Sequence, residues 1–194
     1  MSDWVIVVPV KGTADSKSRL GASASLARAI ALDTVEAALG VGRVIVVTSA
    51  AEAPEFVALG ASVVRDTDSG GLNGAVAAGI AAAGDSPVAV LLGDLPALTS
   101  AELASALSSA ARHPLAFVPD AEGVGTALIA ALTGSAHRPA FGRASRAAHR
   151  AAGYVELELP VTSGLRNDVD TVEDLQQLGS RLGSRTRAAL GGSP

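Results

Sequence analysis

The chain has 194 residues, the size of one ordinary domain, and is long enough to bury a core without disulfides. Hydrophobic residues make up 48% of it and charged residues 18%, a composition that excludes an intrinsically disordered chain. The formal net charge is −4 and no long basic stretch is present, so nucleic acid is not an expected partner.

The sequence contains no cysteine, which excludes disulfides and thiolate metal sites. Its first apolar run, residues 5–10, follows no basic leader and is too short for a signal peptide or a membrane span. We therefore expect a cytoplasmic protein that has no membrane partner, and the lack of disulfides fits that reducing compartment.

Apolar runs rich in β-branched residues recur along the chain and predict strands. Several are nearly continuous, as in strands that are covered on both faces of a parallel sheet. The predicted strands are residues 5–10, 44–48, 61–64, 88–92, 115–118 and 154–159. Residues 126–132 fit a strand or a helix equally well by periodicity.

Helical patterns lie between these runs. The windows that show them are residues 26–37, 72–83, 103–110 and 172–182. Repeated alternation of strands and helices predicts an α/β fold, a three-layer sandwich with a mostly parallel sheet and helices on both faces. We expect one domain over residues 1–182 and a flexible C-terminal tail over residues 183–194.

The loop after the first predicted strand carries three cations, Lys11, Lys17 and Arg19, among small and hydroxyl residues. Small residues let backbone N–H groups approach phosphate oxygens, and the cations neutralise them. The glycine spacings of a Walker loop and of a dinucleotide fingerprint are both absent. A solvated turn is the alternative, but a position directly after a buried strand favours phosphate binding.

Two acidic positions are candidates for a metal site. Asp94 ends a predicted buried strand, and Mg²⁺ commonly binds one or two carboxylates together with phosphate oxygens. A turn-capping role is the alternative for Asp94. Asp168 and Asp170 precede the last predicted helix, where Asp170 also fits an N-cap with Glu173 as its capping-box partner. We therefore assign Asp168 as the second metal ligand.

Glycine and hydroxyl residues gather in three further loops. In the first, Asn73 can pair with a purine edge through its amide, or act as a helix N-cap. Residues 123–126 and 141–145 offer backbone amides and hydroxyls, and two such anion cradles suggest a second anionic ligand. Among the neighbouring residues, surface, packing or capping roles are expected for Asp33, Asp66, His149 and Arg150, although Arg143, Arg146 and Arg150 share a helix face.

Taken in order, these segments resemble the phosphoenolpyruvate or 2-phospho-L-lactate guanylyltransferases of deazaflavin coenzyme biosynthesis. The resemblance runs from about Val5 to Leu178. The matching segments are Val8–Lys11 with Lys17–Leu20, Gly71–Asn73, Asp94–Leu98, Gly125–Thr126, Phe141–Gly142 with Ser145 and His149, and Leu165–Arg166 with Asp168–Asp170. Val124 departs from the family, in which threonine is common at that position.

The resemblance implies a nucleotidyltransferase with the glycosyltransferase-A-like, Rossmann-like fold. It would transfer GMP from GTP to phosphoenolpyruvate or 2-phospho-L-lactate and release pyrophosphate. The implied roles are catalysis on the GTP phosphates for Lys11, Lys17 and Arg19, nucleotide binding for Lys11, Gly71 and Asn73, Mg²⁺ binding for Asp94 and Asp168, and acceptor binding for Thr126, Gly142 and Ser145. The next pathway enzyme is an expected partner, because it would consume a labile product.

Three other interpretations share parts of the pattern. A glycosyltransferase of this fold carries an Asp-x-Asp motif, which residues 168–170 match formally, although the motif normally follows a mid-chain strand. A sugar or molybdopterin nucleotidyltransferase differs only in its acceptor. A regulatory domain would bind GTP without turnover. The residues do not separate the two acids, and only the Ala-rich, actinobacterial style of the sequence favours phosphoenolpyruvate.

Overall fold

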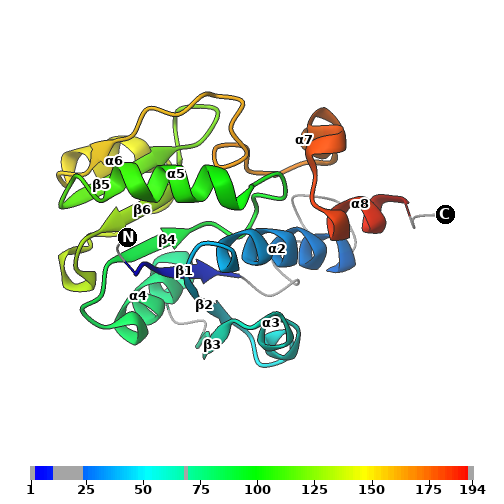
Figure 1. Cartoon of the computed structure of the whole chain (residues 1–194), viewed down its shortest axis with the longest axis horizontal. Helices are drawn as coiled ribbons and strands as arrows, with labels where there is room; N and C mark the ends of the chain where they lie inside the picture. The colour runs from blue at the N-terminus through cyan, green and yellow to red at the C-terminus, as the bar shows by residue number, and fades with distance from the viewer. Residues whose placement is uncertain (1–2, 11–23, 68–69, 192–194) are drawn as a thin grey trace.

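The computed structural model describes residues 3–10, 24–67 and 70–191 (Figure 1). In this part of the chain seven strands form one sheet in the order β3-β2-β1-β4-β6-β5-β7. The strands are β1 (Val5–Pro9), β2 (Arg43–Thr48), β3 (Ser62–Arg65), β4 (Val88–Leu91), β5 (Leu115–Pro119), β6 (Thr126–Ala131) and β7 (Val155–Glu156). The predicted α/β class with a mostly parallel sheet is confirmed.

Only β6 runs against its neighbours among these strands, pairing antiparallel with both β4 and β5. The periodicity of residues 126–132 left strand and helix open, and the segment is a strand. Its direction follows from the loop before it, since residues 120–125 are too few for a crossover and suffice for a hairpin. The predicted strand at 154–159 is shorter than expected, because only two residues pair with β5.

Helices cover both faces of the sheet, as Figure 1 shows. The described helices are α2 (Ala24–Leu39), α3 (Ala53–Leu59), α4 (Gly71–Ala83), α5 (Ser100–Ala110), α6 (Ser145–Ala151), α7 (Val172–Leu178) and α8 (Ser184–Gly191), with short 3₁₀ turns at Gly134–Ala136 (η1) and Gly179–Arg181 (η2). None of them is both long and apolar enough to span a bilayer.

The two faces hold separate apolar clusters because successive residues of β1 point to opposite sides. Ile6 and Val8 pack with residues of α2 and α5, whereas Val5 and Val7 pack with residues of α4. On the α4 side the helix lies close to the sheet, since a Cβ added to Gly79 would lie 2.3 Å from Val7 Cγ1. These four residues of β1 are at most 2% exposed, so the first strand lies within the core.

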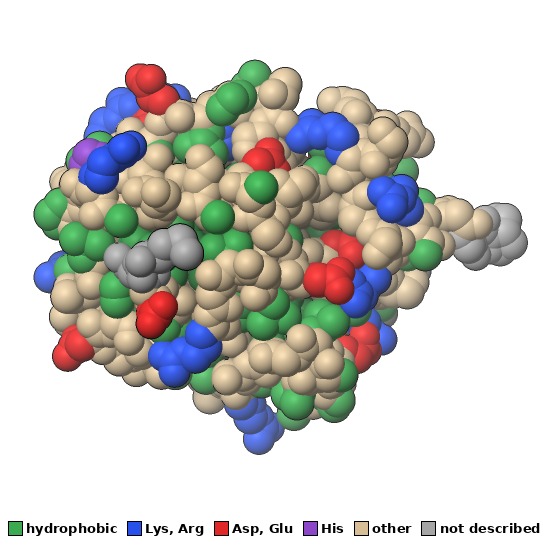
Figure 2. Space-filling model, in the orientation of Figure 1, with side chains coloured by type: hydrophobic (Ala, Val, Ile, Leu, Met, Phe, Trp, Pro, Cys, Tyr) green, Lys and Arg blue, Asp and Glu red, His purple; other side chains and the backbone are tan. Residues whose placement is uncertain are grey.

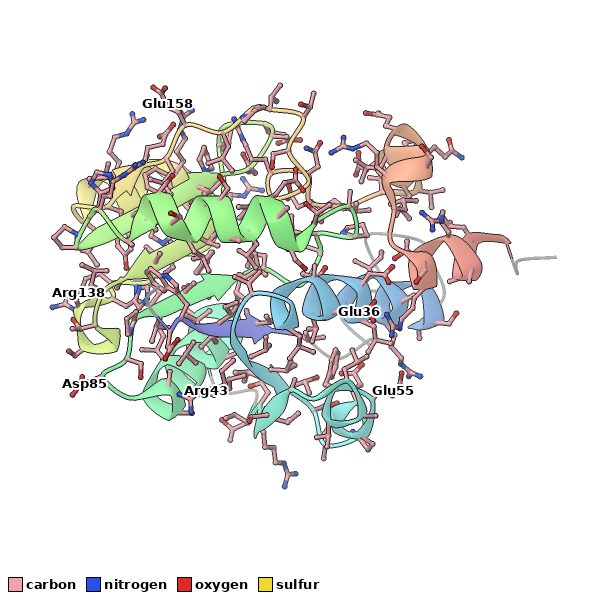
Figure 3. The ribbon with its side chains drawn as sticks, in the orientation of Figure 1. Glu36, Arg43, Glu55, Asp85, Arg138 and Glu158 are labelled. Atoms are coloured by element: carbon pink, nitrogen blue, oxygen red, sulfur yellow. The ribbon has the colours of Figure 1, made fainter. Side chains whose placement is uncertain are left out.

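The C-terminal segment differs from the expected flexible tail. Residues 184–191 form α8, which packs on α2, and the buried Asp33 of α2 accepts hydrogen bonds from Arg185 N (3.2 Å), Thr186 N (2.8 Å) and Thr186 Oγ1 (2.7 Å). Asp33 thus has the capping role expected for it. Glu36, labelled in Figure 3, adds an exposed ion pair to Arg185 at 2.5 Å.

Two capping boxes fix helix starts near the sheet edge. Thr99 caps α5 with Glu102. Thr171 caps α7 with Asp174, so the predicted cap of Asp170 with Glu173 was wrong by one position. Both pairs place an acidic side chain three residues after the capping residue, and the structure uses Thr171 with Asp174. As a result, the Asp170 side chain takes no part in the cap.

Candidate active site

The predicted site residues that the structure describes converge on one edge of the sheet. Strands β1, β2, β4 and β5 end there, and β6 begins there, because it is antiparallel. Leu92 N, just past β4, donates to Ala127 O of β6 at 3.0 Å, which puts Asp94 and Thr126 in adjacent loops. The β1 arrow in Figure 1 points to the side on which α7 and α8 lie. Lys11, Lys17 and Arg19 lie outside the described residues.

A backbone contact joins Asp94 to the segment that carries Asp168. Val169 N donates to Asp94 O at 3.0 Å, so the two acid-bearing segments are directly joined. Asp94 Oδ1 is buried and has no hydrogen-bond partner among the described residues. Burial, followed by repulsion from Asp168, raises the pKa of Asp94 to about 7. Burial also raises the pKa of Asp168 to about 6, with repulsion from Asp120, Asp170 and Glu122 adding to it.

These carboxylates fit a divalent cation in their chemistry. A buried carboxylate oxygen without a partner is costly, and repulsion between close carboxylates adds to the cost, so a cation between them would relieve both. Within the described ranges, no group of three or more acidic or His side chains is placed to hold a metal ion together. A pair of carboxylates suits Mg²⁺, which keeps room for phosphate oxygens and water. Asp170, two residues after Asp168, is exposed.

The loop between β5 and β6 is organised by Asp120, and this corrects one expectation. Residues 123–126 were expected to offer free backbone amides to an anion, but Asp120 Oδ1 accepts from Val124 N at 3.0 Å and Oδ2 from Gly125 N at 2.6 Å. The carboxylate therefore already occupies both amides. A Cβ on Gly125 would lie 2.2 Å from Asp120 Oδ2, so only glycine fits there.

Thr126 is 3% exposed and its hydroxyl is paired with a buried histidine. Thr126 Oγ1 lies 3.0 Å from His149 Nδ1, and Ala140 N donates to His149 Nε2 at 3.0 Å. The imidazole packs edge-on against Phe141 and Tyr154, with ring centroids 5.1 and 5.3 Å away. The packing role expected for His149 is thus confirmed. Its two specific hydrogen bonds were not visible in the sequence, since periodicity places a residue on a face and does not name its partners.

Asn73 is tied to the other predicted acceptor loop. Its Nδ2 donates to Phe141 O at 2.9 Å and its Oδ1 accepts from Phe141 N at 3.0 Å. The alternative role as N-cap is wrong, because Gly70, at φ 106°, holds that position. Both amide atoms serve the backbone, so Asn73 joins the start of α4 to the loop that carries Gly142.

The loop after Phe141 has unusual backbone geometry. Gly142 has φ 137°, and Ala144 has φ 56°, a left-handed conformation that costs a residue with a side chain about 1–2 kcal/mol. Ser145 is 3% exposed, and within the described chain its hydroxyl has no hydrogen-bond partner. Arg146 N donates to Val124 O at 3.1 Å, which holds this loop against the start of β6.

Arginine side chains hold the backbone segments next to the site. Arg166, which the sequence analysis gave no role of its own, donates to the carbonyl oxygens of Pro119, Asp120 and Leu159 over 2.7–3.2 Å. The helix face expected for Arg143, Arg146 and Arg150 is only partly present, because α6 begins at Ser145 and Arg143 lies in the turn before it. Arg146 and Arg150 both pair with Glu156, at 2.7 and 2.5 Å, whereas Arg143 is exposed. On the face that Figure 2 shows, acidic and basic side chains are interspersed.

A cavity of about 820 Å³ lies elsewhere, at the opposite edge of the sheet. It is lined by residues before β1 and β2 and by α5, including Trp4, Gly42 and Leu107. None of the predicted site residues lines it. Arg138 and Asp85, labelled in Figure 3, also lie toward that end of the molecule, away from α7.

Comparison with known proteins supports one family. A model of the MobA-like NTP transferase domain matches residues 12–158. The chain is 50% identical to the phosphoenolpyruvate guanylyltransferase of Streptomyces coelicolor, over 95% of this chain and 94% of that one. It is 46% identical to the enzyme of that name from Salinispora arenicola, over 96% and 92% of the two chains.

Solved structures show the same fold at lower identity. A protein from Desulfovibrio desulfuricans described as a nucleotide-diphospho-sugar transferase is 21% identical, with a TM-score of 0.74 over 98% of this chain and 95% of that one. Rv0371c from Mycobacterium tuberculosis, solved in complex with manganese, is 20% identical, with a TM-score of 0.59 over 91% and 97%. The sheet-edge carboxylates, the family model and the relatives agree, and the chain belongs to the phosphoenolpyruvate guanylyltransferase family of MobA-like nucleotidyltransferases.

Proposed function

We propose that the chain transfers GMP from GTP to phosphoenolpyruvate, giving a guanosine diphospho-linked acid and pyrophosphate. The observation that carries the proposal is identity of up to 50% with enzymes named for this reaction, along nearly the whole of both chains. The Asp94 and Asp168 carboxylates and the neutral donors near Thr126 lie at the same sheet edge, and they support the proposal because the reaction joins two anions.

Asp94 and Asp168 would hold Mg²⁺, and Asp170 is the alternative to Asp168 as the second ligand. When bound, the cation neutralises charge on the phosphate oxygens of GTP and of the acceptor. The protein's own contribution is to hold the two acidic segments in place. Asp94 follows a fully buried strand, and the Val169–Asp94 backbone bond fixes the second acidic segment against it.

The nucleotide would lie along the loops after β1 and β3. Lys11, Lys17 and Arg19 would hold its phosphates, and Gly71 would permit close approach of the nucleoside because it has no side chain, and its φ of 60° favours glycine. Asn73 has both amide atoms bonded to Phe141, so it would act by shaping the wall between the nucleoside and the acceptor.

The acceptor would lie between β6 and α6. The Thr126 and Ser145 hydroxyls and the Gly142 amide are neutral donors, which suit a phosphate or a carboxylate. An acceptor phosphate oxygen would attack the α-phosphorus of GTP, the bond to the β-phosphate would break, and pyrophosphate would leave. The attacking oxygen is already ionised, so no general base is needed. The rate enhancement would come from alignment of this oxygen with the α-phosphorus.

The pathway role follows from the family resemblance. We place the reaction in the cytoplasm and in deazaflavin coenzyme biosynthesis, with the next enzyme consuming the labile product. The main competing acceptor is 2-phospho-L-lactate, which has the same phosphate and carboxylate. A glycosyltransferase is less suited, because the mid-chain strand ends in a single carboxylate, Asp94.

Pyrophosphate release from GTP and Mg²⁺ tests the proposal, with phosphoenolpyruvate and 2-phospho-L-lactate supplied separately. Release with phosphoenolpyruvate that disappears in Asp94→Asn would support it. Release with 2-phospho-L-lactate alone would identify that acid as the acceptor. If GTP binds but neither acid yields pyrophosphate, the guanylyltransferase assignment fails.

A further inference from the structure

The hydrogen bonds around His149 fix which of its ring nitrogens carries the proton. A backbone N–H can only donate, so the bond from Ala140 N requires His149 Nε2 to accept. The imidazole is fully buried, and burial lowers its pKa to about 4, so the ring is neutral near pH 7. A neutral ring that accepts at Nε2 carries its proton on Nδ1.

The direction of the Thr126 bond follows. Because Nδ1 carries the proton, it can only donate in its 3.0 Å contact with Thr126 Oγ1, and the ring also has a hydrogen bond with the backbone of Ser145. The hydroxyl is therefore the acceptor in this contact, and its own proton is left to donate elsewhere. Within the described residues, no other group is hydrogen bonded to Thr126 Oγ1, although the residue is only 3% exposed.

The second buried histidine provides a contrast. His137 Nε2 donates to Val88 O at 3.0 Å, so its Nδ1 accepts from the Tyr154 hydroxyl, also at 3.0 Å. The Tyr154 oxygen in turn accepts from Arg138 N at 2.8 Å. Every polar hydrogen in this series of hydrogen bonds has an acceptor within the protein. The hydrogen bonds around His149 instead end at the Thr126 hydroxyl, a buried donor without an acceptor among the described residues, which is costly unless a ligand supplies one.

Thr126 is the first residue of β6, at the sheet edge that Asp94 also reaches. The Arg146–Val124 backbone bond holds α6 against it, and Ser145 brings a second unpaired hydroxyl to the same side of the loop. We propose that His149 is a positioning residue for the acceptor: it keeps the Thr126 hydroxyl turned so that its proton donates to an anionic oxygen of the bound phospho-acid.

This inference rests on the proposed function, and a double-mutant cycle separates the two. His149→Gln keeps an acceptor for Ala140 N but removes the donor to Thr126, and Thr126→Val removes the hydroxyl. Each change should raise the KM and the calorimetric Kd for phosphoenolpyruvate about tenfold, the effect of one lost hydrogen bond to a charged group, and leave the KM for GTP unchanged. The double variant should be no weaker than Thr126→Val, because both changes remove one interaction.

His149→Asn places an amide N–H where Nδ1–H was, so it should recover most of the acceptor affinity. His137→Gln is the matched control, expected to lower Tm without changing the KM for the acceptor. Effects of His149→Gln that add to those of Thr126→Val, or that appear equally in the KM for GTP, would overturn the inference. So would a His149→Asn variant as weak as His149→Gln, which would assign the effect to the Ala140 bond.

If the His149 variants do not fold, Thr126→Ser against Thr126→Val decides, since serine keeps a hydroxyl that His149 can orient. Equal acceptor affinity in the two would overturn the inference. A wild-type protein that folds, binds GTP and releases no pyrophosphate with either acid overturns the proposed function instead, a result distinct from all of these.

Discussion

The carbonyl oxygen of Asp94 accepts a 3.0 Å hydrogen bond from the amide nitrogen of Val169. This one backbone contact brings together a carboxylate at the end of β4 and the acidic segment before α7. Burial raises the pKa of both side chains, repulsion from Asp168 raises that of Asp94 further, and repulsion from Asp120, Asp170 and Glu122 raises that of Asp168 further. A folded chain that holds carboxylates in this way is less stable than it would be without them, which is typical of a site built for a cation.

The first prediction concerns that cost. Asp94→Asn should stabilise the metal-free protein by about 1–2 kcal/mol, or roughly 2–8 °C in Tm, because it removes a buried charge that lacks a partner. It should also lower kcat with GTP and phosphoenolpyruvate at least about 100-fold, since a cation ligand is lost. Thermal unfolding in a chelator and pyrophosphate release measure the two effects.

Asp85 provides the control, because it is exposed at the far end of the molecule (Figure 3). Asp85→Asn should change neither quantity. An Asp94→Asn protein that is less stable than wild type without metal would show that Asp94 has a structural role, and would remove the argument for a cation there.

The second prediction concerns Asp120, whose carboxylate accepts from Val124 N and Gly125 N. Asp120→Ala should lower the free energy of unfolding by about 1–3 kcal/mol, because the Val124 and Gly125 amides lose their carboxylate acceptor. It should raise the KM for the acceptor more than the KM for GTP, since the loop leads directly into Thr126. Denaturant unfolding and steady-state kinetics measure these, and equal changes in both KM values would contradict the assignment of this loop to the acceptor.

Much of the fold was predictable because its signals are local. The continuous apolar run of β1 predicted a doubly covered strand, and the rule that ligands lie beyond strand ends pointed to the loop that holds Asp94. The helix over residues 184–191 was not predicted. Its stability depends on Asp33, a residue far away in the sequence, and no local pattern announces such a cap.

The partners of polar groups were the least predictable part of the site. The amides at 124 and 125 looked free in the sequence, and Asp120 occupies them in the structure. Asn73 looked like a ligand for a base, and its amide is bonded to Phe141. Composition shows that donors are present in a loop, but only the tertiary structure decides whether the protein itself supplies their acceptors.

The third prediction concerns Arg166, whose guanidinium binds the carbonyl oxygens of Pro119, Asp120 and Leu159 at once. Arg166→Lys keeps the charge but replaces a planar fork by a single ammonium, which cannot reach all three. We expect a loss of about 1–3 kcal/mol in stability and a higher KM for the acceptor. Arg181→Lys is the control, because Arg181 is exposed and bonds one carbonyl, that of Thr162. If Arg166→Lys and Arg181→Lys change stability and the KM for the acceptor equally, the planar guanidinium of Arg166 is not what holds the loop between β5 and β6.

The last prediction is a pH dependence of stability that arises from the buried histidines. Burial, with repulsion from His137, lowers the pKa of His149 to about 4, and burial also lowers the pKa of His137. Tyr154, the other titratable group packed against His149, has a pKa raised by burial and stays neutral. In the unfolded chain both imidazoles titrate near pH 6.5, so below that value the unfolded state binds protons that the folded state does not.

The two histidines therefore lower the free energy of unfolding as pH falls from about 6.5 towards about 4, whereas the raised pKa values of Asp94 and Asp168 act in the opposite direction over much of the same range. The pKa values of Glu102 and Glu156 are lowered by their hydrogen bonds, so their contribution is lost only near the acidic end of this range. The histidine contribution is isolated by comparing variants: between about pH 7.5 and about pH 5, the change in Tm of His149→Gln should be displaced towards higher Tm relative to the change in wild type. Thr126→Val keeps the imidazole and should keep the wild-type slope. An unchanged slope in His149→Gln would mean that the ring is already charged in the folded protein, contrary to the bond that Nε2 accepts from Ala140 N.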